Sequence, residues 1–213
     1  MATRFLIDGS EQARITLLLA HGAGTGMDSA AMTASAKALA ESGFRVARFE
    51  FDYMASRRIS ASRKPPPRAD LLKTEYLAAV DALDRRGPLI IGGKSMGGRV
   101  ASMVADELYA SRRIAGLLCL GYPFHPPGKP DQLRTAHLAE IETPTLIVQG
   151  TRDLFGTREE VSSYTLSKNI EIFWLEDGDH DLRPRKTISG FSATDHLRTL
   201  GGAVSAWAGR IVR

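Results

Sequence analysis

The chain has 213 residues, 43% of them hydrophobic and 24% charged, which suffices for one sizeable core, and we expect a single domain spanning residues 1–213. Its net charge of +4 comes from basic residues spread along the chain, which argues against a nucleic-acid-binding protein. No apolar run of about 18 residues occurs, and Asp8 and Glu11 stand where a signal peptide needs basic and apolar residues, so we expect a soluble cytoplasmic protein without a membrane partner.

Short apolar runs alternate along the chain with longer segments of helical periodicity. This alternation predicts an α/β protein, a three-layer α/β/α sandwich around a mostly parallel sheet of about six or seven strands. Several runs are nearly continuous in Leu, Ile and Val, which is typical of strands buried on both faces. The expected strands are ITLLLA (15–20), RVARFEF (45–51), PLIIGG (88–93), IAGLLCLG (114–121), PTLIVQG (144–150) and IEIFWLE (170–176).

The segments between these runs predict helices at residues 29–42, 69–85, 97–110, 158–165 and 192–210. In the third, apolar residues at helical spacing predict one face against the sheet: Val100, Met103, Val104 and Leu108. Two proline-rich stretches, residues 56–68 and 121–132, are expected to be irregular loops. The single cysteine, Cys119, excludes an internal disulfide, and its apolar neighbours predict a buried strand residue.

Residues 93–97 read Gly-Lys-Ser-Met-Gly and match the pattern G-x-S-x-G, which holds a nucleophilic serine on a sharp strand-to-helix turn. The strand 88–93 leads directly into Ser95, and the predicted helix starts directly after it. Such a turn crowds its neighbours, which explains the glycines two residues before and after the serine. One alternative is that Ser95 only caps the helix. A phosphate-binding P-loop fails, because its first glycine would fall on Pro88.

A serine nucleophile needs a base that takes its proton and a third group that orients the base. Asp153 follows the strand 144–150 and His180 follows the strand 170–176, so both are expected beside Ser95 at one edge of the sheet. Three further acidic residues adjoin His180 and could orient it instead: Asp177, Asp179 and Asp181. We prefer Asp153, because immediate neighbours seldom reach the imidazole ring, and we interpret the other three as solvated turn formers.

Attack by Ser95 would place negative charge on the substrate oxygen, so two N–H donors must face that position. The backbone of Met96 is expected to supply one. The other is expected from the loop His21-Gly22-Ala23-Gly24 after the first core strand, with Ala23 as the first choice and Gly24 as the second. The alternatives are a plain glycine turn and a dinucleotide-binding motif, and the latter fails on glycine spacing.

Other polar residues are weaker candidates. Lys94 beside the nucleophile either binds an acidic substrate or faces solvent or an ion-pair partner, and we favour the second interpretation. His125 is a candidate substrate contact, whereas His137 and His196 are interpreted as surface or core side chains and not as catalytic residues. The loop at 56–68 could favour anionic substrates through its basic residues, although such loops usually only aid solubility: Arg57, Arg58, Arg63, Lys64 and Arg68.

Taken in order, HGAG near residue 21, GGKSMGG around Ser95 and DGDH near His180 resemble the α/β-hydrolase superfamily over nearly the whole chain. The chain is similar to its small, lid-poor branch, which includes dienelactone-hydrolase-like proteins and predicted serine hydrolases. This resemblance implies the α/β-hydrolase fold and an esterase-like reaction through an acyl-enzyme, with no metal or cofactor. Dienelactone hydrolases use a cysteine nucleophile where this chain has Ser95, so a lactone substrate does not follow.

Two hypotheses about function result. The first is hydrolysis of a small ester, thioester or related acyl substrate, with Ser95 attacking and His180 transferring the proton. The second is a catalytically idle hydrolase fold that serves as a binding or scaffold protein, since a fold does not fix a function. The presence of all three triad residue types favours the first hypothesis.

Overall fold

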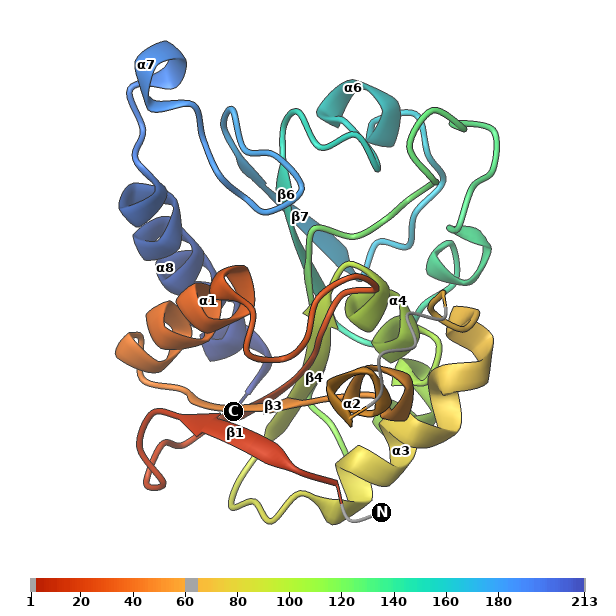
Figure 1. Cartoon of the computed structure of the whole chain (residues 1–213), viewed down its shortest axis with the longest axis vertical. Coiled ribbons are helices and arrows are strands. Elements are labelled where there is room, and N and C mark those ends of the chain that lie inside the picture. Colours follow the sequence, from red (N-terminus) through yellow and green to blue (C-terminus); the bar gives the residue numbers. More distant parts are fainter. Residues whose placement is uncertain (1–2, 60–64, 213) are drawn as a thin grey trace.

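The structure of the protein is a computed structural model, which describes residues 3–59 and 65–212. In these residues seven strands form one sheet in the order β1-β3-β2-β4-β5-β6-β7 (Figure 1). β1 pairs antiparallel with β3, and all other neighbours are parallel. The strands are β1 Phe5–Asp8, β2 Thr16–Ala20, β3 Arg45–Phe49, β4 Leu89–Lys94, β5 Gly116–Leu120, β6 Thr145–Gly150 and β7 Ile170–Leu175.

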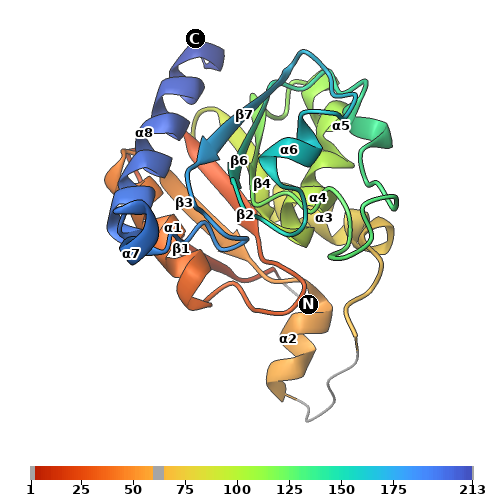
Figure 2. The same cartoon turned by 90° about the horizontal axis from the view of Figure 1, so that it is seen from above.

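Helices cover both faces of this sheet. α1 and α8 pack together on one face, and α3, α4 and α5 lie on the other (Figure 2). The predicted three-layer α/β/α sandwich is therefore confirmed. The helices are α1 Ala30–Glu41, α2 Asp52–Ile59, α3 Lys73–Ala82, α4 Met96–Ser102, α5 Ala105–Ala110, α6 Arg158–Val161, α7 Lys186–Ser189 and α8 Ala193–Ile211, with short 3₁₀ helices η1 Ala69–Leu72 and η2 Ala136–Leu138.

The six predicted strands are all present, each with bounds within two residues of those expected. The prediction missed β1, a half-buried edge strand of four residues whose pattern carries little apolar signal. The predicted helix 97–110 is in fact two helices, because the chain leaves helical geometry between Ser102 and Ala105. Val100, Val104 and Leu108 are nevertheless buried on the predicted side, and Met103 is half-buried.

The expectation of an irregular loop from residue 56 is wrong for its first part. α2 continues through residues 56–59, because the prolines that exclude a helix begin only at Pro65. Residues 60–64 lie outside the described part of the chain. The prediction at 158–165 was too long, since α6 ends at Val161, and the single-turn helix α7 was not predicted.

Two clusters of buried side chains, one on each face, hold the layers together. The first joins α3, α4 and α5 to the sheet, and the second joins α1 and α8 to it. All residues of β2, β4, β5 and β6 are buried, as the continuous apolar runs predicted. Cys119 is 1% exposed within β5, and burial raises the pKa of its thiol, which confirms a buried strand residue.

Because β2, β4, β6 and β7 are parallel, their carboxyl ends meet at the same edge of the sheet. The segments that follow these four strands carry the candidate residues singled out above. In the described residues no helix has the length and apolar character needed to cross a membrane.

Candidate active site

Ser95 lies on the sharp turn between β4 and α4. Its backbone has φ 52° and ψ −118°, a conformation that non-glycine residues rarely adopt and that occurs mainly at functional sites. Its side chain makes no capping hydrogen bond to α4, so the N-cap alternative does not account for this serine. The hydroxyl instead faces the loop after β7.

The glycines that flank Ser95 are required by close backbone contacts. A Cβ atom at Gly93 would lie 2.5 Å from the carbonyl oxygen of Ala20. One at Gly97 would lie 2.4 Å from the same oxygen and 2.6 Å from that of His21. The predicted crowding of the turn is therefore confirmed, and it seats α4 directly against the end of β2.

His180 lies between Ser95 and Asp153 in the loop that follows β7. Its Nε2 is 2.9 Å from Ser95 Oγ, and its Nδ1 is 2.8 Å from Asp153 Oδ2. Because a carboxylate can only accept, Nδ1 carries a proton and donates to Asp153, which leaves Nε2 of the neutral ring free to accept from the serine hydroxyl. The ring of Phe155 stacks on the imidazole with centroids 4.1 Å apart.

Asp153 is fully buried and receives two hydrogen bonds besides that from His180. The backbone N–H of Phe155 donates to Oδ1 at 2.9 Å, and Nε2 of Gln149 donates to Oδ2 at 2.9 Å. Gln149 itself is fully buried in β6, where its Oε1 accepts from the backbone N–H of Tyr122. Sequence reasoning missed Gln149 and Phe155, although a glutamine inside an apolar strand was a visible signal.

The three acidic neighbours of His180 have other partners. Asp177 is 7% exposed and bonds to Arg185, whose hydrogen bond lowers the pKa of this carboxyl to about 2. Asp179 accepts the backbone N–H groups of Asp181 and Arg183, which shapes the loop as expected of a turn former. Asp177 is not solvated, contrary to the prediction, because it is enclosed by arginine side chains.

Lys94 pairs with Asp181. It does not line the cavity of about 370 Å³ that opens beside Ser95 and is described below. It is 9% exposed, and its Nζ donates to Asp181 Oδ1 and to the carbonyl oxygen of His180, each at 2.8 Å. Burial opposes ionisation of Asp181, but the hydrogen bond and charge of Lys94 outweigh it and lower the pKa of this carboxyl. Lys94 therefore secures the loop that carries His180, which is the ion-pair alternative.

His125 also lies apart from that cavity. It is 2% exposed, its Nδ1 contacts the carbonyl oxygen of Pro126 at 2.8 Å, and its Nε2 is 3.5 Å from Glu160. His137 bonds to Ser102 and His196 to the carbonyl of Leu182, in agreement with structural roles.

The loop His21–Gly24, here called the oxyanion loop, is held by two aromatic-ring side chains. His21 is fully buried; its Nε2 accepts from the backbone N–H of Phe51, so its Nδ1 donates to the carbonyl of Gly22. Burial lowers the pKa of His21, which keeps this ring neutral. The hydroxyl of Tyr53 donates to the carbonyl of Ala23 at 3.0 Å. Neither contact was predicted from the sequence.

A cavity of about 370 Å³ opens beside Ser95, and we call it the Ser95 cavity. Ala23 and Met96, the two first choices for oxyanion donors, line it, whereas Gly24 does not. Phe155, Arg99 and Arg134 contribute to its wall.

Among the described basic residues of the loop 56–68, one contributes to the wall of this cavity. Arg68 lines it and pairs with Asp70. Arg58 pairs with Asp28 and Glu50, and Arg57 lies over the ring of Tyr53. Arg63 and Lys64 lie outside the described residues.

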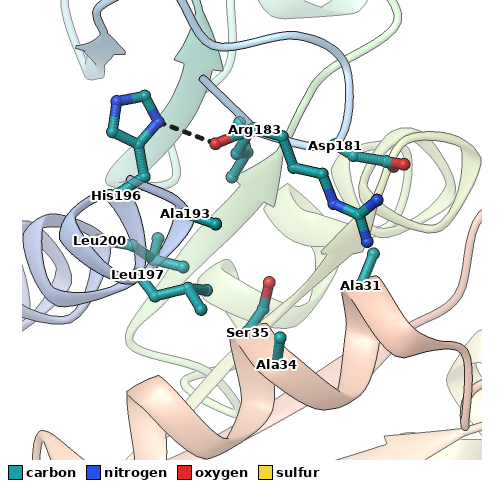
Figure 3. Close-up of a pocket in the computed structure, with 10 residues that line it drawn as sticks. Ala31, Ala34, Ser35, Asp181, Arg183, Ala193, His196, Leu197 and Leu200 are labelled. Carbon is teal, nitrogen blue, oxygen red and sulfur yellow. Dashed lines mark hydrogen bonds between the residues drawn. The ribbon is translucent and has the colours of Figure 1, made fainter. Parts of the chain in front are cut away.

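A second cavity, of about 390 Å³, lies behind the His180 loop, between that loop and the helices α1 and α8 (Figure 3). Asp181 and Arg183 border it, and Nδ1 of His196 lies 2.8 Å from the carbonyl oxygen of Leu182. Ser95, Asp153 and His180 do not line it. Lys94 on β4 and His196 on α8 thus hold the loop from opposite sides.

Comparison with known proteins identifies the family. The family model described as "Alpha/beta hydrolase domain" matches residues 13–209. The chain therefore belongs to the alpha/beta-hydrolase family, as its motifs predicted. The expected enzyme class, a hydrolase of ester-type bonds, agrees with membership of this family and with the deacylase name of a relative.

Individual relatives are more distant. A Rattus norvegicus protein named "Putative protein-lysine deacylase ABHD14B" is 31% identical over 153 residues, which cover 70% of this chain and 67% of the relative. The chain thus spans about two thirds of the length of the curated relatives it matches.

Solved structures share the fold at lower identity. A dienelactone hydrolase from Anabaena variabilis superposes with a TM-score of 0.73 at 18% identity, covering 99% of this chain and 93% of that one. XC6422 from Xanthomonas campestris, described as a serine hydrolase without lid, gives a TM-score of 0.66 at 20% identity, covering 98% and 88% of the two chains. These two similarities concern the fold alone.

Proposed function

We propose that the protein is a serine hydrolase that cleaves a small ester, thioester or related acyl substrate through an acyl-enzyme on Ser95. The observation that carries this proposal is the continuous hydrogen-bonded chain from Asp153 through His180 to Ser95. A serine hydroxyl becomes nucleophilic at neutral pH only when such a base is within reach, and only when a third group holds that base in the correct tautomer.

In the first half of the reaction, Ser95 Oγ attacks the substrate carbonyl carbon while His180 Nε2 takes the hydroxyl proton. Asp153 stabilises the resulting imidazolium without taking its proton. The backbone N–H groups of Met96 and Ala23 stabilise the oxyanion of the tetrahedral intermediate. His180 then gives its proton to the leaving group, and the acyl group remains on Ser95.

In the second half, a water molecule attacks the acyl carbon and gives a proton to His180. The tetrahedral intermediate collapses with release of the acid, and the proton returns to Ser95 Oγ. Apart from the substrate and the attacking water molecule, these steps use groups of the chain.

Names of similar proteins support an acyl substrate without fixing its leaving group. The curated relative is named for removal of acyl groups from protein lysines, and structural neighbours include an esterase domain and a thioesterase domain. All three names refer to the removal of an acyl group from its carrier. The volume of the Ser95 cavity, about 370 Å³, is in the range of sites that take small molecules.

A fluorophosphonate probe tests the proposal, because it reacts only with an activated serine. We expect labelling of the native protein, loss of labelling in Ser95→Ala, and a loss of at least about 10³-fold in kcat for p-nitrophenyl esters in Ser95→Ala and His180→Ala. The two losses should be non-additive in the double variant, because the residues act as one unit.

The chain offers a matched control in a second serine–histidine pair. Ser102 Oγ lies 2.8 Å from His137 Nε2, and in the described residues no carboxylate bonds to the other nitrogen of this ring. His137→Gln should therefore leave labelling and kcat within about two-fold of the native values. A native protein that is not labelled would instead favour the idle, scaffold hypothesis.

A further inference from the structure

Two arginine side chains line the Ser95 cavity together with the nucleophile. Arg99 comes from α4, one turn after Ser95, and Arg134 from the segment between β5 and η2. Both are half-buried. Neither position was singled out by the sequence, where Arg99 is simply a helix residue and Arg134 a loop residue.

Neither guanidinium group has a partner within the described residues. Their side chains take part in no hydrogen bond or ion pair there, and the buried Nε of Arg99 has no acceptor. Asp70, the acidic residue of the cavity wall, is bonded to Arg68. Residues 1–2, 60–64 and 213 include no aspartate or glutamate, so their side chains supply no carboxylate either.

Two other arginines of the protein do have carboxylate partners. The nearly buried Arg48 bonds to Asp8, and Arg58 bonds to both Asp28 and Glu50. A desolvated cation without a counter-charge is costly, so proteins normally pair it. Two arginines beside a candidate nucleophile that have no carboxylate partner in residues 3–59 and 65–212 therefore point to an anionic ligand.

The two cations also affect each other. Burial lowers the pKa of Arg134, and the neighbouring positive charge of Arg99 lowers it further. Like charges this close repel, and an oxyanion placed between them would relieve both the repulsion and the missing hydrogen bonds.

We propose that Arg99 and Arg134 bind an anionic group of the substrate, a carboxylate or a phosphate, while its scissile acyl bond lies at Ser95. The planar guanidinium group suits both anions, because its donors match their oxygen geometry. This inference rests on the proposed function, which it narrows to small acyl substrates that bear an acidic group. Two basic residues that the sequence suggested for this role have other partners: Lys94 pairs with Asp181, and Arg58 pairs with Asp28 and Glu50.

A pair of esters of equal acyl length tests the inference. Mono-(4-nitrophenyl) glutarate carries a terminal carboxylate, and 4-nitrophenyl pentanoate does not. We expect the native protein to favour the glutarate ester in kcat/KM by at least about 10-fold, which is the effect of one charge-assisted hydrogen bond. Arg134→Gln and Arg99→Gln should each lose this preference, measured as the ratio of kcat/KM for the two esters within the same variant.

Arg198→Gln provides the control for net charge. Arg198 lies on α8, on the opposite face of the sheet, and its side chain is 75% exposed beside Asp195 (Figure 2). This variant should keep the native preference. Equal kcat/KM for the two esters in the native protein, or an unchanged ratio in both cavity variants, would overturn the inference even if both esters are cleaved through Ser95.

Ligand binding separates this inference from the proposed function. If neither ester is cleaved and Ser95 is not labelled, the proposed function fails, and thermal shifts with glutarate and with inorganic phosphate then decide about the anion site. A rise in Tm of the native protein that is absent in Arg134→Gln supports the site, and the effective anion distinguishes carboxylate from phosphate. No shift with either anion overturns it.

Discussion

Replacement of Lys94 by methionine removes the contacts that join β4 to the His180 loop. Methionine keeps the length and the apolar stem of a side chain that is 9% exposed, but it removes the charge and both hydrogen bonds of Nζ. The carbonyl of His180 and the carboxylate of Asp181 then lose their partner. We expect His180 to spend less time within hydrogen-bonding distance of Ser95.

The magnitude follows from the two contacts. A hydrogen bond from a charged donor contributes about 1.5–3 kcal/mol, and the one to the carbonyl of His180 belongs in this range. The side chain of Asp181 is 43% exposed, so solvent screens its pair with Lys94, which adds only about 0.5 kcal/mol. A total of about 2 kcal/mol, if all of it orients His180, corresponds to roughly a 30-fold lower rate.

The assay is the rate of fluorophosphonate labelling together with kcat/KM for a neutral ester. Asp181→Asn is the matched control, because it keeps an oxygen acceptor for Nζ and the bond to the carbonyl of His180, and it should cost no more than about three-fold. A native labelling rate in a folded Lys94→Met protein would refute the view that this lysine positions His180.

Three further substitutions, one of them with a control, probe the turn, the oxyanion loop and the ion pairs of Asp177. Gly97→Ala should destabilise the protein by about 1–3 kcal/mol in urea unfolding and abolish labelling, because its Cβ would lie 2.4 Å from a carbonyl of β2. Gly202→Ala on α8, where nothing lies within 4 Å, should instead stabilise by up to about 1 kcal/mol. Burial raises the pKa of Tyr53 to about 12, so its hydroxyl remains a donor at assay pH, and Tyr53→Phe should lower kcat by about 5–10-fold without a change in KM. The pKa of Asp177 is lowered to about 2, so its charge stabilises the fold above about pH 4 and this contribution is lost as the pH falls. Asp177→Asn should therefore lower the free energy of unfolding, and with it Tm, at pH 7. About half of this loss of unfolding free energy should remain at pH 3, and an equal loss at both pH values would contradict the assignment.

The sheet and the positions of Ser95, Asp153 and His180 could be predicted because their signals are local. Continuous apolar runs mark strands that are buried on both faces, such as β4 and β6, and each of these three residues lies on the segment that follows a predicted strand. The need for glycine at positions 93 and 97 could likewise be predicted from the sequence, because a sharp turn tolerates no side chain there.

Other features depend on contacts between distant segments, and no local pattern encodes them. Gln149 is one polar residue of a strand, and only the register of the following turn brings its amide to Asp153. The break between α4 and α5 interrupts an apolar periodicity that continues through it, so the spacing alone predicted one helix. Arg99 and Arg134 line the same cavity only because the fold brings the segment between β5 and η2 to the cavity that α4 borders.

The loop that carries His180 is fastened to a central strand through Lys94 and to a long outer helix through His196. Such a segment has no independent hinge, so opening it requires the release of both neighbouring layers. Its amide protons should consequently exchange with solvent as slowly as those of the core, and heat or denaturant should remove labelling and secondary structure in one cooperative transition.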